Sequence, residues 1–206
     1  MLNIYLVRHG QDADNAHSIL NGRRDPPLTT RGINQAGELA QKIKHAGLHF
    51  TAIYTSPLKR ARQTAQIIAK VLGGPKPVKL TDLIERDFGI MAGKSHTQIE
   101  ELCAPDILKT PTITYFLSPE GAETFPQLIG RAGRLLGHLN EKHRGNILLV
   151  GHGDFGKMIY CAYYKLDWKE VLAMFHFGYS DLLLMSPNSK AEDVYVFRSP
   201  HNLPAL

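Results

Sequence analysis

Five short apolar runs, separated by longer amphipathic segments, limit the folds that this chain can adopt. The runs are Leu2 to Val7, Ile53-Tyr54, Ile147 to Val150, Leu182 to Met185 and Val194 to Phe197. Nearly unbroken apolar runs of this length are typical of strands that are buried on both faces. Strands that alternate with helices favour parallel pairing, because each helix returns the chain to the same edge of the sheet. We therefore predict a three-layer α/β/α sandwich with a mostly parallel central sheet.

Four of the intervening segments have helical spacing. After Thr29-Thr30, which can cap a helix, apolar residues recur every three or four positions as far as Ile43. Leu58 to Leu72 repeats this pattern and is followed by Gly73-Gly74-Pro75, which ends a helix. Two further helices are predicted over residues 125–139 and 153–164.

Charged and polar residues gather where three of the predicted strands end. The first strand runs into Arg8-His9-Gly10 and another into Gly151-His152-Gly153, while a third leads toward Arg60. In an open parallel sheet, ligands bind beyond the carboxyl ends of the strands, so these groups are expected to meet at one edge. Arginine presents a fork of donors that matches phosphate oxygens, and histidine can act as a nucleophile. The combination favours a site for a phosphoryl group.

The composition narrows the range of partners. The net charge is +5, but the basic residues are dispersed among acids, so no nucleic-acid partner is expected. No apolar run approaches the roughly 18 to 20 residues of a membrane-spanning helix, so no membrane partner is expected either. Residues 1–7 lack the basic leader and cleavage site of a signal peptide, which predicts a cytoplasmic protein. Both a monomer and a homodimer are compatible with the sequence.

Several blocks of the sequence, in order along almost the whole chain, resemble the histidine phosphatase superfamily. This superfamily includes cofactor-dependent phosphoglycerate mutases, fructose-2,6-bisphosphatases and small broad-specificity phosphatases. The similar blocks are Leu6-Val7-Arg8-His9-Gly10 with Asn15, Pro27-Leu28-Thr29, Ser56 to Ala65, Leu83 to Gly89, Ala122-Glu123-Thr124 and Val150 to Gly153. One triplet alone would be weak evidence, but ordered blocks at suitable spacings are specific. Ala122 departs from the glycine that the family has at its position.

The resemblance implies a phosphoglycerate mutase-like fold and a role for each matching residue. His9 would be the nucleophile that forms a phosphohistidine, and Glu85 would be the proton donor. Arg8, Arg60 and His152 would surround the phosphoryl oxygens. Substrate-binding positions match Asn15, Asn21, Gly22 and Gly153. Three cationic groups can stabilise the transferred phosphoryl group without magnesium, so we expect no metal and no cofactor.

The remaining features concern the subclass and the extent of the domain. We expect one domain over residues 1–206, in which an irregular excursion at about residues 90–122 covers the active site.

The mutases place a tyrosine where this chain has Phe88. They also carry a longer insertion and a longer C-terminal tail over the site than this chain, which ends at Leu206. A shorter cover favours attack by water. A metal-independent phosphatase acting on a small phosphorylated substrate is therefore the preferred interpretation.

Two alternatives remain open at the level of sequence. One is a cofactor-dependent phosphoglycerate mutase, and the other is a non-catalytic module that binds phosphate or a phosphoprotein. The leaving-group side of the substrate is expected to contact Ile90, Met91, His96, Tyr115 and Phe116. These side chains favour a partly apolar leaving group.

Overall fold

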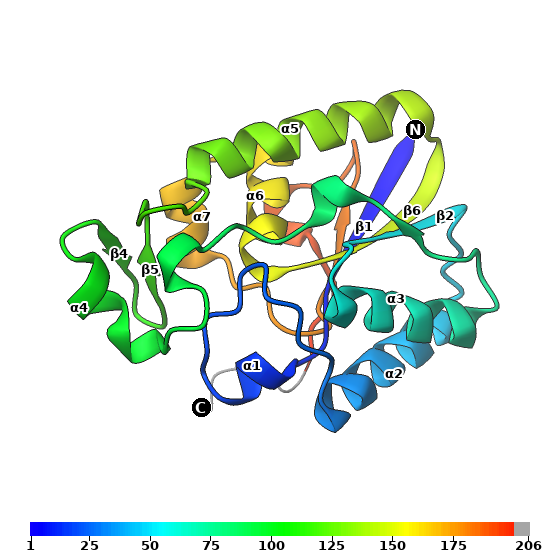
Figure 1. Cartoon of the computed structure of the whole chain (residues 1–206). Helices are drawn as coiled ribbons and strands as arrows, with labels where there is room; N and C mark the ends of the chain where they lie inside the picture. Colours follow the sequence, from blue (N-terminus) through cyan, green and yellow to red (C-terminus); the bar gives the residue numbers. More distant parts are fainter. Residues whose placement is uncertain (200–206) are drawn as a thin grey trace.

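The computed structural model, which describes residues 1–199, has a central six-stranded sheet with helices on both faces (Figure 1). The order of the strands across the sheet is β3-β2-β6-β1-β7-β8. Their bounds are β1 (Leu2–Arg8), β2 (Ala52–Thr55), β3 (Val78–Lys79), β6 (Gly145–Gly151), β7 (Leu182–Met185) and β8 (Tyr195–Phe197). β1, β2, β3 and β6 pair in parallel, whereas β7 is antiparallel to both of its neighbours. The predicted three-layer α/β/α class and the five predicted strands are confirmed.

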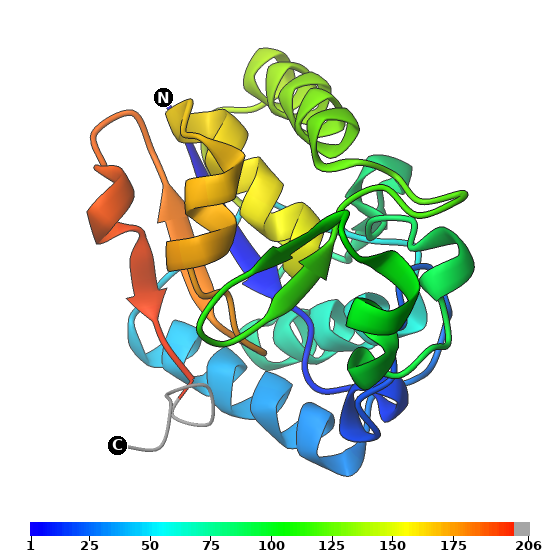
Figure 2. The same cartoon turned by 90° about the vertical axis from the view of Figure 1, so that its left-hand side faces the viewer.

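The long helices form the two outer layers. Their bounds are α2 (Thr30–His45), α3 (Lys59–Leu72), α5 (Phe125–Lys142) and α6 (Gly153–Tyr164). α2 and α3 pack together on one face of the sheet, and α5 and α6 pack together on the other, where the short α7 (Trp168–Met174) joins them (Figures 1 and 2). All four predicted helices are present, whereas β3 and α7 were not predicted. No helix among residues 1–199 is both long and apolar enough to span a membrane.

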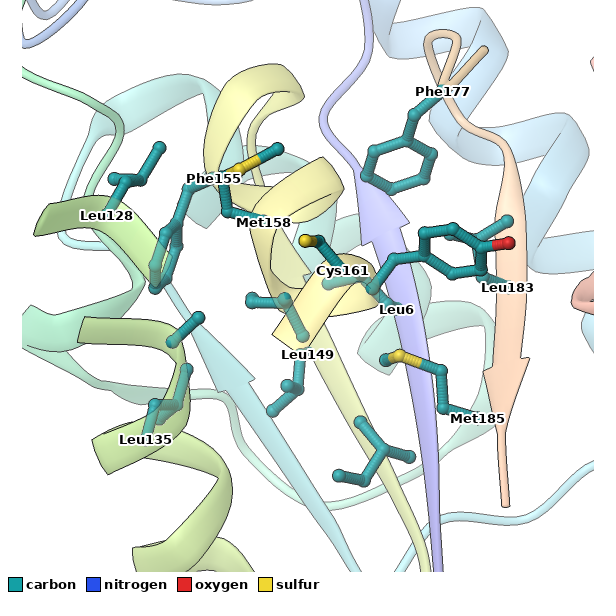
Figure 3. Packing of buried hydrophobic residues seen from close by; sticks show 14 of the residues in the cluster. Leu6, Leu128, Leu135, Leu149, Phe155, Met158, Cys161, Phe177, Leu183 and Met185 are labelled. Atoms are coloured by element: carbon teal, nitrogen blue, oxygen red, sulfur yellow. The ribbon is translucent and has the colours of Figure 1, made fainter. Parts of the chain in front are cut away.

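Alternation along the central strands divides the hydrophobic core in two. Leu2, Ile4 and Leu6 of β1 pack on the α5–α6 side, whereas Tyr5 and Val7 pack on the α2–α3 side. The same alternation in β6 sends neighbouring side chains to opposite faces, as expected for a strand covered on both sides. Figure 3 shows the α5–α6 side, where side chains of both central strands meet those of the two helices. This double burial holds β1 and β6 rigidly at the centre of the molecule.

The ends of the helices follow local sequence signals. The hydroxyl of Thr29 accepts a hydrogen bond from Gly32 N (3.1 Å) and begins α2, and Thr124 forms a capping box with Gln127 that begins α5. α3 ends at Gly73, whose φ of 60° lies in the left-handed region that favours glycine. The cap at Thr29 places the start of α2 next to the loop that follows His9, whereas Gly73 lies at the opposite edge of the sheet, beside residues 48–50.

The segment at residues 90–122 is more regular than expected. It contains a short helix, α4 (Ile99–Cys103), and an antiparallel hairpin of β4 (Ile107–Lys109) and β5 (Thr114–Phe116). A third, smaller cluster of buried residues supports it, including Phe88, Met91, Ile99 and Phe116. The three prolines of the segment concealed these short elements, which are stabilised by tertiary packing rather than by local propensity.

A close backbone contact fixes the loop that follows β1. A Cβ atom at Gly32 would overlap the carbonyl of Gln11, and one at Gly10 would overlap the carbonyl of Gly32. The first turn of α2 therefore presses directly against the backbone that follows His9. Such an approach is open only to residues without a side chain.

Two alanine substitutions in α2 should consequently have opposite effects on stability. Gly32→Ala should lower the free energy of unfolding by about 1 to 3 kcal/mol, the usual cost of overpacking. Gly37→Ala, at a helical glycine with no atom within 4 Å of the added Cβ, should raise it by about 0.5 to 1 kcal/mol. Urea unfolding of both variants measures the difference. Equal stabilities would contradict a tight contact between α2 and the loop.

Candidate active site

The parallel pairing of β1 with β6 places His9 and His152 side by side. In the register of this pair, Arg8 lies opposite Gly151, and His9 N donates a hydrogen bond to the Gly151 carbonyl (3.0 Å). One residue beyond the last pair of each strand, the two imidazole rings are 5.1 Å apart between centroids. Both histidines are buried: the exposed fraction is 2% for His9 and 0% for His152. The two His-Gly motifs thus form one site.

Hydrogen bonds hold His9 in a single tautomer. Its Nδ1 lies 2.7 Å from the carbonyl oxygen of Gly10, and because a carbonyl only accepts, Nδ1 carries the proton. Its Nε2 accepts from Nε of Arg60 at 3.1 Å and so carries a lone pair. Burial, followed by the positive charges of Arg60 and Arg8, lowers the pKa of His9 well below its usual value. His9 is therefore a neutral imidazole with an available nitrogen lone pair, as a nucleophile requires.

Arg60 is held rigidly in the first turn of α3. Its Nη1 donates to the carbonyl of Arg24 (2.7 Å) and its Nη2 to the carbonyl of Gly22 (2.8 Å). The guanidinium is fully buried, and its Nε also lies 3.3 Å from a carboxylate oxygen of Asp12. The N-terminus of a helix adds a favourable potential for anions at this position.

Asp12 connects Arg60 to two of the predicted substrate-binding residues. It caps α1 (Ala13–Ala16) by accepting from Asn15 N at 2.9 Å, and it accepts from the side-chain amide of Asn21 at 2.6 Å. Because Asp12 itself is completely buried, these bonds and the Arg60 contact compensate for the loss of hydration. The loop after β1 is thereby positioned against α3.

Two polar atoms of the site are buried without a hydrogen-bond partner in residues 1–199: Nε of Arg8 and Nδ1 of His152. The other groups of these side chains are anchored. Arg8 Nη1 donates to the Phe177 carbonyl (2.8 Å), and His152 Nε2 lies 2.7 Å from the Ser56 hydroxyl. Burial, followed by the charge of Arg60, lowers the pKa of His152 well below its usual value, so His152 is neutral and not the cationic group expected from the sequence. Buried polar atoms are normally paired, so these two fit oxygen atoms of a bound anion.

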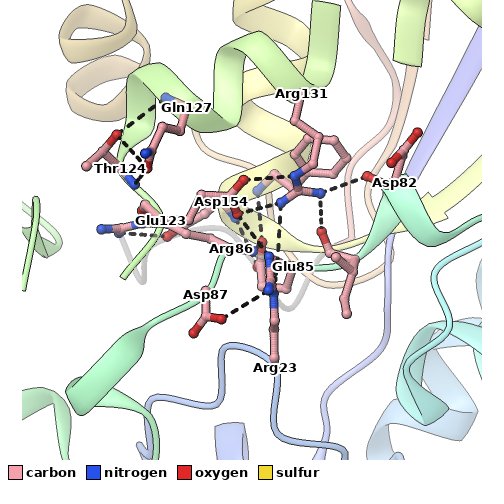
Figure 4. A network of polar contacts seen from close by, with 12 residues as sticks. Arg23, Asp82, Glu85, Arg86, Asp87, Glu123, Thr124, Gln127, Arg131 and Asp154 are labelled. Atoms are coloured by element: carbon pink, nitrogen blue, oxygen red, sulfur yellow. Dashed lines mark hydrogen bonds and ion pairs between the residues drawn. The ribbon is translucent and has the colours of Figure 1, made fainter. Parts of the chain in front are cut away.

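The carboxyl group of Glu85 lies at the N-terminus of α6 (Figure 4). It accepts hydrogen bonds from the backbone N–H groups of Arg86 (2.8 Å), Phe155 (2.9 Å) and Asp154 (3.2 Å). Its pKa is raised, mainly by burial and then by the charge of Asp154, although the N–H donors of Arg86 and Phe155 oppose this. A carboxyl group with a raised pKa retains a proton more readily and can donate it.

A polar frame of arginines and acids supports Glu85. Arg131 binds the carboxylate of Glu123 through two hydrogen bonds, at 2.9 and 2.8 Å, and also donates to the carbonyl of Ile84 (2.7 Å). The fully buried Arg86 donates to the carbonyls of Phe116 and Leu117, each at 2.9 Å, and so joins this frame to the β4–β5 hairpin. Figure 4 shows Arg131 above Glu85 and Arg23 below it, and Glu123 accepts hydrogen bonds from both arginines. Glu123 therefore holds Arg131 in place beside Glu85.

A cavity of about 690 Å³ adjoins these groups. Five of the predicted site residues line it: Arg8, Asn15, Asn21, Glu85 and Gly153. His9, Arg60 and His152 are buried and do not belong to the lining residues, and neither does Gly22. Gly22 was predicted to bind substrate, but its carbonyl holds Arg60 and its left-handed backbone (φ 49°) packs on the Phe88 ring.

The leaving-group side of the cavity differs in part from the expectation. His96, Tyr115 and Phe116 line the cavity as expected. Ile90 and Met91 do not, because Ile90 is 51% exposed at the surface and Met91 is buried in the cluster beneath the excursion. The 90–122 segment thus contributes to the cavity mainly through the hairpin and His96.

Several residues of the site could not be identified from the sequence. Asp12 lies between Gly10 and Asn15, and Ser56 begins another of the blocks that resemble the family, but their partners become visible only in the structure. Tyr179 lines the cavity, stacks under the Arg8 guanidinium (4.2 Å) and lies 6.1 Å from the His9 ring, yet no motif surrounds it. Lys157 also lines the cavity, and only its position four residues beyond Gly153 in the predicted helix was a usable clue. Within residues 1–199, no group of three or more His, Cys, Asp or Glu side chains is arranged to hold a metal ion.

Comparison with known proteins agrees with this geometry. The model of a family described as the histidine phosphatase superfamily (branch 1) matches residues 4–192. A relative from Parvibaculum lavamentivorans, named as a 2,3-bisphosphoglycerate-dependent phosphoglycerate mutase, is 30% identical over 179 residues, which cover 83% of this chain and 84% of the relative.

Solved structures show the same fold. A mycobacterial glucosyl-3-phosphoglycerate phosphatase, in a complex with VO3, superposes with a TM-score of 0.77 and 25% identity, over 89% of this chain and 92% of that one. A variant of phosphoserine phosphatase from Entamoeba histolytica, in complex with phosphoserine, superposes with a TM-score of 0.73 and 27% identity, over 89% and 90% of the two chains.

Proposed function

Because this chain belongs to the histidine phosphatase superfamily, whose members transfer phosphoryl groups, we propose that it hydrolyses phosphomonoesters through a phosphohistidine on His9. The observation that carries this proposal is the state of the His9 ring. Its Nδ1–H is bound by the Gly10 carbonyl, and its Nε2 carries a lone pair beside two guanidinium groups. A nucleophile and positive charge on the equatorial oxygens are the main requirements of phosphoryl transfer.

In the first step, Nε2 of His9 attacks phosphorus and forms the P–N bond while the P–O bond to the leaving group breaks. Nε of Arg60, released from His9, donates instead to a phosphoryl oxygen. The unpartnered Nε of Arg8 and Nδ1 of His152 bind further oxygens. The protonated carboxyl of Glu85 transfers its proton to the departing ester oxygen, because an alkoxide is otherwise a poor leaving group.

In the second step, water attacks the phosphohistidine. The Glu85 carboxylate accepts a proton from this water as the P–O bond forms and the P–N bond breaks, which releases phosphate and regenerates neutral His9. The three N–H donors around Glu85 stabilise its ionised form between the two steps. The positive charges come from side chains of this chain, so the proposed reaction requires no metal ion.

A cofactor-dependent mutase is the second candidate, since the curated relatives at about 30% identity carry that name. A mutase must retain the phosphoenzyme while its substrate reorients, which requires a site closed to water. Here Phe88 lines the cavity and packs edge-on against Phe116 (5.1 Å between centroids), and it offers no hydroxyl where the mutases have tyrosine. This difference supports the hydrolase.

Brief turnover of a ³²P-labelled phosphomonoester, followed by rapid quenching, should trap label on His9. The linkage should be labile in acid and stable in alkali, as expected for a phosphoramidate. His9→Ala should carry no label, whereas His17→Ala, at an exposed histidine, should be labelled like the wild type. Label that survives in His9→Ala would move the nucleophile to another residue.

Hydrolysis should be faster than isomerisation. Supplied with 3-phosphoglycerate and a bisphosphoglycerate primer, the protein should release inorganic phosphate faster than it forms 2-phosphoglycerate, because water reaches the phosphoenzyme. Phosphate release and isomer formation can be followed in the same sample. The reverse ratio would identify a mutase, and no turnover of any phosphomonoester would favour a non-catalytic binding module.

Glu85→Gln should separate substrates by their leaving groups. In single turnover, the loss of the proton donor should slow phosphorylation by an alkyl phosphate by about 10²- to 10⁴-fold. Phosphorylation by p-nitrophenyl phosphate should slow much less, because nitrophenolate leaves as a stable anion. Arg60→Ala is the control, since charge stabilisation of the phosphoryl oxygens is needed for both substrates. Equal losses for the two leaving groups in Glu85→Gln would exclude Glu85 as the acid.

A further inference from the structure

A buried lysine that the proposed mechanism does not use lies on α6, one turn beyond the N–H groups that bind Glu85. Lys157 is only 5% exposed, yet it lines the cavity. Its ammonium group donates a hydrogen bond of 2.6 Å to the hydroxyl of Tyr115 on β5, and it lies 5.2 Å from the centre of that ring. Lysine is almost never buried unless its ammonium group is paired with an anion or with hydrogen-bond acceptors.

The surroundings of Lys157 compensate this charge only in part. No carboxylate forms an ion pair with it within residues 1–199. Its pKa is lowered to about 8, chiefly by burial, while the negative charges of Asp154 and Glu85 act in the opposite direction and the positive charge of Arg8 adds to the lowering. The ammonium therefore remains charged at neutral pH and has two N–H groups beyond the one that Tyr115 accepts.

We propose that Lys157 and Tyr115 bind an anionic group, of the carboxylate class, on the leaving group of the substrate. This inference rests on the proposed phosphatase function and specifies its substrate class as phosphomonoesters of acidic alcohols. The Tyr115 hydroxyl accepts from Lys157 and keeps its own proton for donation. An ammonium and a phenol side by side match the two oxygens of one carboxylate.

The position of Lys157 on α6 sets the spacing of the two substrate groups. Lys157 is four residues beyond Gly153, which corresponds to a rise of about 6 Å along a helix. The Glu85 carboxyl group, beside the expected ester oxygen, is bound by the N–H groups of Asp154 and Phe155. The anionic group and the phosphate ester of the substrate would therefore be separated by a short carbon skeleton.

The remaining cavity wall fits this assignment. The same cavity is also lined by Ile113, Leu172 and Phe175, which can contact carbon atoms of the leaving group. His176, another lining residue, has a pKa lowered by burial and by the charge of Lys157, so it stays neutral and does not replace the lysine as a cation. Among the lining residues, the lysines and arginines are Arg8, Arg86 and Lys157. The guanidinium group of Arg86 already donates to backbone carbonyls, which leaves Arg8 and Lys157 as the cations that face the cavity.

A structural role for the pair is the competing explanation, since the 2.6 Å bond also ties the β4–β5 hairpin to α6. The two explanations differ in what they predict for substrate choice. A tether would affect every substrate to the same extent, whereas a carboxylate-binding pair affects only substrates that carry the carboxylate.

The test compares 3-phosphoglycerate with glycerol 3-phosphate, in which a CH₂OH group replaces the carboxylate. Wild-type protein should favour 3-phosphoglycerate in kcat/KM. Lys157→Met should lower kcat/KM for 3-phosphoglycerate by about 10- to 100-fold, the factor expected for a lost charge-assisted hydrogen bond. The change for glycerol 3-phosphate should be within about threefold, which also shows that the variant is folded. Tyr115→Phe should shift the preference in the same direction by a smaller factor.

Lys142→Met, at an exposed lysine on α5, is the matched control and should leave both substrates unchanged. Equal losses for the two substrates in Lys157→Met, or no preference for the carboxylate in the wild type, would overturn the proposal while the phosphatase function stands. A wild-type protein that hydrolyses neither compound but does hydrolyse p-nitrophenyl phosphate would also overturn it. Failure to hydrolyse all three would refute the phosphatase function itself, and the inference with it.

Discussion

The site depends on the in-register parallel pairing of β1 with β6. The two strands run together from Leu2 opposite Gly145 to Arg8 opposite Gly151, so the residues that follow them, His9 and His152, end at the same height. Both strands are covered on two faces, which fixes their register because a slip of one residue would move every side chain to the wrong face. The 5.1 Å between the histidine rings is thus a consequence of the core rather than of contacts within the site.

Around this pair the protein buries an unusual number of charges. Arg60, Arg86, Glu85 and Asp12 are each at most 5% exposed, and Arg131 is 8% exposed. Removing charged groups from water is expensive unless they are fully hydrogen-bonded. Backbone carbonyls satisfy most of the guanidinium groups, and backbone N–H groups satisfy the carboxylates. Arg8 Nε and His152 Nδ1 have no hydrogen-bond partner within residues 1–199. In the proposed reaction these two atoms bind phosphoryl oxygens, which would compensate for their burial.

The two halves of the site are built differently. The residues proposed to bind the phosphoryl group come from strand ends and the first turns of α3 and α6, which the core holds in place. The wall proposed to contact the leaving group comes from the β4–β5 hairpin, α7 and the loop after it. Lys157 joins the hairpin to α6, and Arg86 joins it to the acid frame. A rigid reacting centre beside a wall of separate segments allows the chemistry and the choice of substrate to be set by different residues.

Sequence by itself determined the layers, the main helices, the strand ends and the residues that resemble a phosphoryl-transfer site, because hydrophobic periodicity and short motifs are local properties. It placed Ile90 and Met91 in the wall of the cavity, which they do not line, because the direction in which a loop residue points depends on what packs behind it. Only the tertiary structure decided the partners of Asp12 and Ser56, the position of Tyr179, and the hydrogen bond between Lys157 and Tyr115. Contacts of this kind join residues far apart in the sequence, for example Arg8 and the Phe177 carbonyl, which are separated by 169 positions. Local pattern cannot specify them, because chain folding brings such distant groups together.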